Sequence, residues 1–247
     1  MVAEAPQWDE RSTETFLAEG DVFVPCREEQ IGIVTGRLFD GRRPPGRVVE
    51  LCCGEGLLTR SILERDPQVR VLALDASPGM LEALLRTAGS AADRVTPLAF
   101  RLESSDWRTG IGPADAIVSS LAIHHLDGPG KAALFRDLNE MLTPGGVLVI
   151  ADLIEPASEP ARRSFADQWE REVEIRSLER RGDRSGLDRF RALDWNYYDP
   201  REPDPLDKPS TLIEQFDWLR AAGFVRIDLL WCVAGHAILS AEKPERP

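Results

Sequence analysis

The sequence predicts an α/β fold built on a doubly wound, mostly parallel sheet of seven strands, with an antiparallel last strand and a helical insertion before the sixth strand. Three observations predict this fold. Short apolar runs typical of buried strands alternate with segments of helical periodicity. A glycine-containing turn joins the first such strand to the helix that follows it. The strand signal is interrupted between residues 155 and 210, where a helical pattern replaces it.

The first half of the chain repeats a unit of one strand followed by one helix. The first strand is predicted at residues 48–51, and its helix follows a tight glycine turn. A second strand at residues 69–74 ends before Asp75, and Ser77-Pro78 supplies the cap and the first turn of the next helix. The remaining strands of this half are expected at residues 95–102, 114–119 and 147–150.

Residues 155–210 are predicted to form a helical insertion that acts as a lid. A structureless connection of this length is unusual in a compact domain. Phe165, Trp169 and Val173 recur at the four-residue spacing of an amphipathic helix. The chain then returns to the sheet with one more helix and two strands, at residues 225–231 and 236–241. Their short connection through Gly235 makes this last pair antiparallel.

These elements divide the chain into four parts around one core. The core would bind a cofactor, the N-terminal segment would cover the cofactor cleft, and the C-terminal helix and strands would complete the sheet. In chain order the parts are an N-terminal helical segment (1–46), the cofactor-binding core (47–154), the insertion or lid (155–210) and the C-terminal part (211–247).

The composition argues against several classes of partner. The formal net charge of −12 repels polyphosphates, so nucleic acid is an unlikely substrate. A local basic patch is the alternative, at Arg162, Arg163, Arg180, Arg181 and Arg184. The chain shows neither a membrane-spanning apolar run nor a signal-peptide pattern, and its cysteines lack a disulfide framework. We therefore expect a cytoplasmic protein, monomeric or homodimeric. We expect no bound metal, because the paired ligand spacing of zinc sites is missing from the sequence.

The turn after the first strand carries the strongest functional signal. It reads Glu50-Leu51-Cys52-Cys53-Gly54-Glu55-Gly56, and its glycines let backbone N–H groups approach a ligand. Asp75 follows Gly56 by about 20 residues, at a strand tip where a carboxylate can accept ribose hydroxyls. A dinucleotide site would need a third glycine where Thr59 stands. An anionic Glu50 suits the ammonium and sulfonium groups of S-adenosylmethionine better than a pyrophosphate.

With these residues in place, the sequence resembles the class I S-adenosylmethionine-dependent methyltransferases, which have a Rossmann-like fold. The loop at residues 48–56 is similar to the family's acid-x-G-x-G-x-G loop, with Cys52 in place of the usual first glycine. Further matching stretches follow in the family's order, at residues 74–80, 106–107, 119–126 and 142–147. The resemblance covers the predicted core and implies an enzyme that transfers methyl groups (EC 2.1.1.-).

The resemblance also implies which residues bind S-adenosylmethionine. The glycine loop would hold the amino-acid end of the cofactor, the second strand tip its ribose, the following segments its adenine, and the end of the fourth strand the region near the sulfonium. The residues implied are Glu50, Cys52, Cys53, Gly54 and Gly56 in the loop, Asp75 for the ribose, Ala76, Met80, Asp106 and Trp107 for the adenine, and Ser119, Ser120 and Leu121 near the sulfonium.

Two groups of residues are candidates for acting on the methyl acceptor. His124 and His125 follow the fourth strand, where a histidine could be the general base for a hydroxyl or amine, or could pack at a helix start. Trp195, Tyr197 and Tyr198 in the insertion could stack on an aromatic acceptor, or could anchor the lid to the core.

The outer segments are similar to those of carboxy-S-adenosylmethionine synthase and its relatives. This similarity lies in residues 8–25 and 219–231. Trp218 stands where that enzyme has an arginine for the extra carboxylate, which favours ordinary S-adenosylmethionine. Arg27 could pair with the cofactor carboxylate if the N-terminal segment folds over the cleft, or could be a solvated surface group.

We therefore expect a methyltransferase that uses S-adenosylmethionine, releases S-adenosylhomocysteine and methylates a small, neutral or cationic organic molecule beneath the lid. Because the sulfonium is already a strong electrophile, the protein needs mainly to align donor and acceptor and to exclude water. One alternative is a tRNA- or cofactor-modifying enzyme of the carboxy-S-adenosylmethionine synthase type. Another is a non-catalytic regulatory protein that binds the cofactor.

Overall fold

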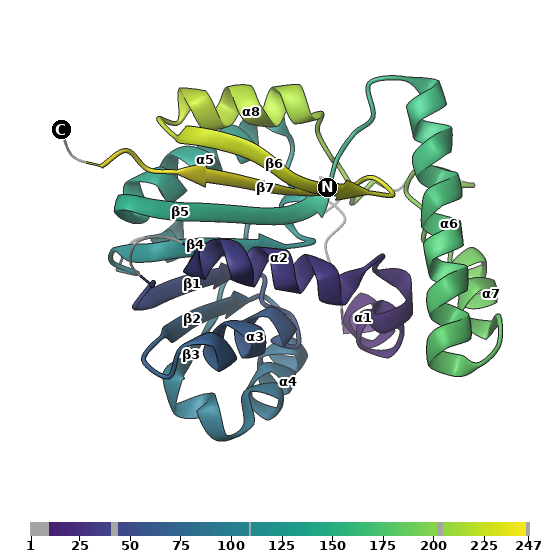
Figure 1. The fold of residues 1–247 in the computed structure, drawn as a ribbon, viewed down its shortest axis with the longest axis horizontal. Coiled ribbons are helices and arrows are strands. Elements are labelled where there is room, and N and C mark those ends of the chain that lie inside the picture. Colours follow the sequence, from purple (N-terminus) through teal and green to yellow (C-terminus); the bar gives the residue numbers. More distant parts are fainter. Residues whose placement is uncertain (1–9, 41–43, 109, 202–204, 246–247) are drawn as a thin grey trace, which may run out of the picture.

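The computed structural model describes residues 10–40, 44–108, 110–201 and 205–245, and Trp8 and Asp9 lie outside these ranges. The described chain forms one sheet with helices on both faces and a further group of helices at one end (Figure 1). The strands are β1 (Arg47–Leu51), β2 (Arg70–Asp75), β3 (Val95–Ala99), β4 (Ala114–Ser120), β5 (Leu142–Leu153), β6 (Val225–Val233) and β7 (His236–Glu242). The α-helices are α1 (Glu10–Phe23), α2 (Arg27–Phe39), α3 (Leu57–Arg65), α4 (Pro78–Ala88), α5 (Gly128–Met141), α6 (Glu159–Arg181), α7 (Ser185–Ala192) and α8 (Leu212–Ala221). Short 3₁₀ turns are η1 (Gly89–Arg94), η2 (Asp106–Arg108) and η3 (Ile123–His125).

The seven strands lie in the order β3-β2-β1-β4-β5-β7-β6. The first five strands pair in parallel, whereas β7 is antiparallel to both β5 and β6. The strand order reverses at β1, so the connections leaving β1 and β4 run to opposite faces of the sheet. In doubly wound sheets this reversal opens a crevice at the carboxyl ends of the strands, which is where ligands bind.

Helices cover both faces of the sheet and bury two separate apolar layers. On one face, α2 packs against β5 and β7 while α3 and α4 pack against β2, with Ile62 and Leu84 among the fully buried side chains. On the other face, α5 and α8 pack against the sheet, with Phe135 and Leu219 buried there. Because the central strands are buried on both faces, they read in the sequence as continuous apolar runs rather than alternating ones.

The helix that follows β2 shows how local sequence fixes the start of an element. The Ser77 hydroxyl accepts a hydrogen bond from the backbone N–H of Met80 at 3.1 Å and so caps α4. Pro78 occupies the first turn, where a missing N–H leaves no hydrogen bond unmade. This cap holds the loop after Asp75 at the carboxyl edge of the sheet.

The insertion before the sixth strand folds as α6 and α7, which stand beside the end of the sheet next to α1 (Figure 1). Trp169 of α6 donates its indole N–H to the carbonyl of Phe23 at 2.8 Å, and Phe23 packs edge-on against Phe190 of α7. The predicted helical insertion is therefore confirmed, and its contacts show that it braces the N-terminal helix. Its action as a lid stays a prediction.

The predicted fold class is confirmed, with differences at the ends of two strands. The third strand ends at Ala99, within the stretch at residues 95–102 where it was expected. The fifth strand is longer than the expected residues 147–150, because it pairs with β4 from Leu142 and with β7 as far as Leu153. None of the described helices has the length and apolarity that crossing a bilayer requires.

Candidate cofactor and acceptor site

A cavity of about 370 Å³ opens at the carboxyl ends of β1, β2 and β4. Its size falls among small-molecule sites, which range over about 300–1,000 Å³. The sheet supplies the loops after these strands, and α1 and α2 supply the opposite wall. The predicted residues that line it are Arg27, Glu50, Cys52, Cys53, Gly54, Asp75, Ala76, Met80, Ser120, Leu121 and His125.

The loop after β1 turns through backbone conformations that favour glycine. Gly54 has φ 53° and Cys52 also has φ 53°, so Cys52 holds a left-handed conformation that an L side chain adopts at a cost. The departure from the usual glycine at Cys52 thus keeps the tight turn and adds local strain beside the cavity. Gly56 is not among the residues that line the cavity. A Cβ there would lie 2.5 Å from Leu84 Cδ1, so this glycine lets α3 approach α4.

The carboxylate of Asp75 is fixed by backbone donors at the cavity wall. Its Oδ2 accepts from the N–H of Gly54 at 2.9 Å, and its Oδ1 accepts from the N–H of Ser77 at 2.9 Å. Burial raises the pKa of this carboxyl, and the hydrogen bonds from the backbone oppose that rise. Each oxygen has further acceptor capacity, so a vicinal diol such as a ribose matches the group.

Glu50 is a buried acid beneath the same loop. The Thr59 hydroxyl donates to its Oε2, and only 2% of the residue is exposed. Burial is the largest influence and raises the pKa of Glu50 to about 8; the Thr59 hydrogen bond opposes the rise and nearby Asp75 adds to it. Near neutral pH this carboxyl is therefore largely protonated until a cation approaches it.

This raised pKa predicts a pH dependence of cofactor affinity. As pH rises from 6 towards about 8, the free protein carries more Glu50 carboxylate, which favours a sulfonium ligand, so S-adenosylmethionine should bind more tightly. Isothermal titration calorimetry at several pH values measures this trend. The trend should be weaker for S-adenosylhomocysteine, which lacks the sulfonium charge, and Glu50→Gln should flatten it. An unchanged slope in Glu50→Gln would show that another group is responsible.

The N-terminal helices form the cover of the cavity. Arg27 of α2 pairs with Glu55 of the loop at 3.1 Å, and its guanidinium lies 5.1 Å from the ring centroid of Phe16. The Arg27 side chain is 14% exposed, which excludes the alternative of a solvated surface group. Helix α1 also packs against α6 and α7, so the insertion holds this N-terminal helix in place.

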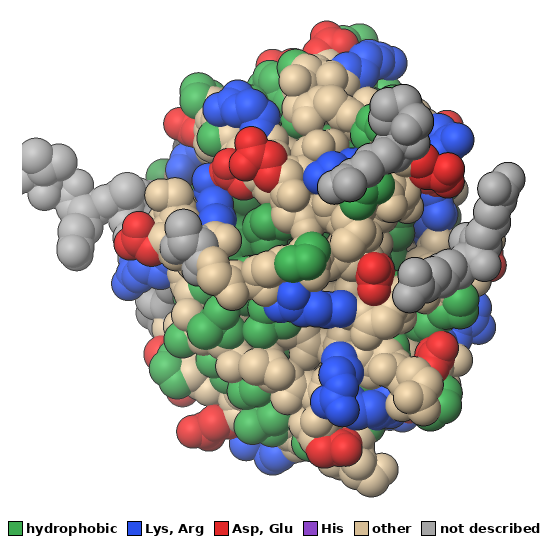
Figure 2. Space-filling view, turned by 90° about the vertical axis from the view of Figure 1, so that its left-hand side faces the viewer, with side chains coloured by type: hydrophobic (Ala, Val, Ile, Leu, Met, Phe, Trp, Pro, Cys, Tyr) green, Lys and Arg blue, Asp and Glu red, His purple; other side chains and the backbone are tan. Residues whose placement is uncertain are grey.

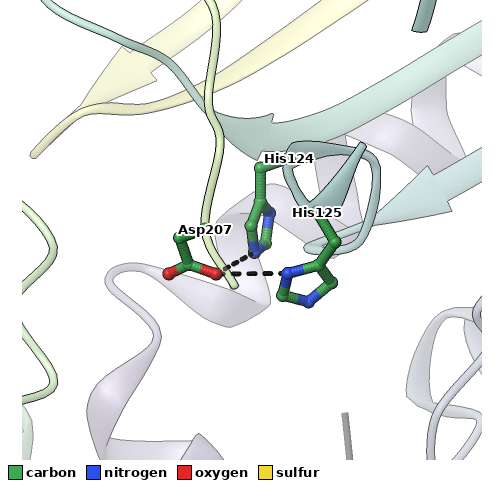
Figure 3. Close-up of side chains that lie close together, drawn as sticks. All are labelled: His124, His125 and Asp207. Atoms are coloured by element: carbon green, nitrogen blue, oxygen red, sulfur yellow. Dashed lines mark ion pairs between the residues drawn. The ribbon is translucent and has the colours of Figure 1, made fainter. Parts of the chain in front are cut away.

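Three side chains next to the cavity form what we call the histidine cluster, namely His124, His125 and Asp207 (Figure 3). His125 lines the cavity. Asp207 Oδ1 lies 3.3 Å from His124 Nε2 and 3.1 Å from His125 Nδ1. On the other side of the His124 ring, Nδ1 contacts Asp152. Burial opposes the charged form of His124, but the two carboxylates outweigh it and raise its pKa to about 10.

Several predicted residues lie away from the cavity lining. Ser119 is buried and donates its hydroxyl to the Leu51 carbonyl at 3.2 Å. Trp107 packs edge-on against Phe100 with ring centroids 5.2 Å apart, and Asp106 stands exposed next to it. Trp218 packs beside Gly128, away from the cavity. The roles predicted for Ser119, Asp106 and Trp107 in binding the cofactor stay predictions.

The aromatic residues of the insertion anchor it to the core. Tyr198 is buried and donates its hydroxyl towards the carbonyls of Ile154 and Gly235, each at 2.8 Å. Tyr197 donates its hydroxyl to Glu155 at 2.7 Å, and Trp195 packs against Phe23. These contacts match the anchoring alternative, and a role of these side chains in substrate binding stays a prediction.

Asp207 is a member of the site that the sequence did not predict. It follows the proline-rich end of the insertion and has no motif around it. It reaches His124 and His125 because the backbone N–H of Lys208 donates to the His124 carbonyl at 2.8 Å. A contact between segments so distant in sequence has no local signal.

The charges around the cavity fit a cationic adenosyl ligand. Carboxyl groups outnumber guanidinium groups among the lining residues, with Glu10, Glu50, Glu55, Asp75 and Glu103 against Arg27 and Arg101. Gly54, in its left-handed conformation, carries no side chain, so a ligand can approach the backbone of the loop there. The residues present therefore suit S-adenosylmethionine.

Comparison with known proteins agrees with this geometry. Residues 49–148 match the family described as a methyltransferase domain. Trans-aconitate 2-methyltransferase of Acidovorax sp. (strain JS42) is 33% identical over 127 residues, which are 50% of this chain and 45% of that protein. The enzyme of the same name from Deinococcus radiodurans is 37% identical over 108 residues, 44% of this chain and 38% of that protein. The chain thus spans about half the length of such relatives or less.

Solved structures share the fold over nearly the whole chain. An O-methyltransferase family protein from Burkholderia thailandensis has a TM-score of 0.67 at 18% identity, covering 97% of this chain and 61% of that one. Human N-acetylserotonin methyltransferase, solved in complex with S-adenosylmethionine, has a TM-score of 0.54 at 12% identity, covering 95% and 54%.

The fold, the cavity and these matches together define a class I methyltransferase domain. The chain carries an S-adenosylmethionine-dependent methyltransferase domain of this class, and the family resemblance seen in the sequence is confirmed.

Proposed function

We propose that the protein transfers the methyl group of S-adenosylmethionine to a small organic molecule held between the cofactor and His125. The observation that carries this proposal is the cavity itself, which is lined by the glycine loop, Asp75 and His125 of the histidine cluster. A cofactor bound along the loop would point its sulfonium towards Ser120, Leu121 and His125, where the remaining space would receive the acceptor.

The bound cofactor would supply an electrophilic methyl group. We propose that Asp75 holds the ribose and that Glu50 and the loop hold the amino-acid end. The N-terminal helices would exclude water. The acceptor would lose its proton at the histidine cluster, and the bond from sulfur to the methyl carbon would break as the bond to the acceptor forms. Sulfur would keep the electron pair, leaving S-adenosylhomocysteine.

The charge of the cavity favours a neutral or cationic acceptor. Its acidic lining would repel a polycarboxylate, and Arg27 already pairs with Glu55. The curated relatives named above are trans-aconitate methyltransferases, and aconitate is an anion, so this chain's acceptor would differ in charge from theirs.

The five arginines considered as a local basic patch are not free. Each of the five arginines considered in the sequence pairs with an acid: Arg162 with Glu155, Arg163 with Glu159, Arg180 with Glu28, Arg181 with Glu19 and Arg184 with Glu174. On the face drawn in Figure 2, basic and acidic side chains are interspersed. These pairings support a small-molecule acceptor over nucleic acid.

The proposed function predicts a specific loss in His125→Ala. We expect its kcat to fall by about 10²- to 10⁴-fold, the usual contribution of a group that assists proton removal, with S-adenosylhomocysteine affinity little changed. Transfer of a radiolabelled methyl group to a panel of phenols, amines and carboxylates measures it. Tight cofactor binding with no transfer to any acceptor would instead favour the non-catalytic regulatory protein.

A further inference from the structure

We propose that the histidine cluster binds a divalent transition cation of the zinc type, held by His124 Nε2, His125 Nδ1 and a carboxylate oxygen of Asp207. This inference deepens the proposed function, on which it rests for the role of the ion in the reaction. It departs from the sequence expectation of no metal, because Asp207 reaches the histidines from a distant segment.

Two of the three distances between the ligand atoms match those in a zinc site. Asp207 Oδ1 lies 3.3 Å and 3.1 Å from the two ring nitrogens, and all three atoms lie within 4.8 Å of one another. Ligands at about 2.0–2.1 Å in a tetrahedron stand roughly 3.3 Å apart. Figure 3 shows both rings turning a nitrogen towards the same carboxylate. Three atoms that are lone-pair donors in their unprotonated forms therefore converge, so either protons on the ring nitrogens or a bound cation must lie among them.

Asp152 orients the buried histidine as carboxylates do behind metal-bound imidazoles. It contacts Nδ1 of His124, and its Oδ2 accepts from the backbone N–H of His124 at 3.0 Å. With Nδ1–H directed to Asp152, Nε2 faces Asp207 and would offer its lone pair to an ion that replaces its proton. A carboxylate behind a ligating histidine fixes the ring and its tautomer and raises its basicity.

The segment that carries Asp207 is anchored by contacts that do not involve the side chains of the cluster. Lys208 donates its backbone N–H to the His124 carbonyl at 2.8 Å. Lys131, which is 2% exposed, donates to the Lys208 carbonyl and to the Ser210 hydroxyl, the latter at 2.8 Å. The ligand atoms are therefore held close together before any ion arrives, which lowers the cost of binding one.

The ligand types select the ion. Two imidazole nitrogens with one carboxylate suit zinc and its neighbours, whereas magnesium and calcium prefer oxygen ligands. A tetrahedral ion with three protein ligands keeps a fourth position. Because His125 lines the cavity, that position would face the acceptor, whose oxygen would lose its proton more easily when bound to the ion.

Titration of chelator-stripped protein without a histidine tag tests the site. We expect calorimetry with zinc chloride to show one equivalent bound, and cobalt(II) to give the intense visible absorption of a tetrahedral complex. Asp152→Asn should weaken zinc binding by about 10- to 100-fold, and Asp207→Ala and His125→Asn by more than about 100-fold. Asp217→Ala is the matched control, because Asp217 is exposed and pairs with Arg220.

The competing explanation is a cluster held by protons alone, with a charged His124 between two carboxylates. This explanation predicts that zinc does not bind stoichiometrically, and that result would overturn the proposal. Equal losses of zinc affinity in Asp207→Ala and Asp217→Ala would also overturn it. S-adenosylhomocysteine titration of each sample reports separately on the cofactor cavity. Cofactor binding without ion uptake would overturn the ion site and leave the proposed methyl transfer standing. If Asp207→Ala does not fold, Asp152→Asn and His125→Asn decide the matter.

Discussion

Replacing Asp75 by alanine is expected to weaken S-adenosylhomocysteine binding by about 10²- to 10⁴-fold. The carboxylate is held by the N–H groups of Gly54 and Ser77, and its remaining lone pairs face the cavity. Two hydrogen bonds to a charged acceptor contribute about 1.5–3 kcal/mol each, and each 1.4 kcal/mol is about a factor of ten in affinity. Isothermal titration calorimetry measures the loss.

Glu64→Ala is the control for removing an acid near this loop. Glu64 is exposed on α3 and pairs with Arg60 at 2.8 Å, so its loss should leave the affinity unchanged. Asp75→Asn keeps the size of the side chain and should fall between the wild type and Asp75→Ala. Equal affinities in Asp75→Ala and Glu64→Ala would show that the ribose binds elsewhere.

The largest expected loss of stability follows from Gly235→Ala. A Cβ at residue 235 would lie 2.2 Å from Cζ and from the hydroxyl of Tyr198, and the residue has φ 74°. The left-handed conformation costs about 1–2 kcal/mol and overpacking about 1–3 kcal/mol. Displacing Tyr198 also breaks its hydrogen bonds to Ile154 and Gly235. We expect the free energy of unfolding to fall by about 3–5 kcal/mol, measured by urea denaturation.

Gly182→Ala is the control that separates backbone strain from the steric clash with Tyr198 expected in Gly235→Ala. Gly182 ends α6 with φ 78°, and among the described residues no atom would lie within 4 Å of its Cβ. This variant should therefore lose about 1–2 kcal/mol, from the left-handed conformation alone. If Gly182→Ala and Gly235→Ala lost the same amount, Tyr198 would not be the anchor that holds the insertion to the core.

The sequence predicts the core of this fold well because its signals are local. The strand at 48–51, its glycine turn and the acid at 75 each follow from short patterns, and the structure places them together. The extent of β5 is harder to predict, since Pro144-Gly145-Gly146 reads as a break. Leu142 pairs with β4 before this stretch and Val147 pairs with β4 and β7 after it, with a register shift between them. The strand therefore continues past a local break because strand pairing holds it on both sides.

The acceptor side of the site depends on contacts that short patterns do not encode. Asp207 comes to His125 through backbone anchoring at Lys208, and the N-terminal helices α1 and α2 line the cavity opposite the loops of the sheet. The insertion's Tyr198 reads equally well as a stacking residue or an anchor until its partners are seen. Local sequence patterns therefore predict the cofactor side of the site, whereas long-range packing determines the acceptor side.

A crystal structure of the protein with S-adenosylhomocysteine tests the central claim most directly. We expect the ligand to fill the cavity with both ribose hydroxyls within hydrogen-bond distance of the Asp75 carboxylate and with its sulfur directed towards His125. Density for the ligand at another surface, or a ribose that leaves Asp75 without contact, would contradict the account.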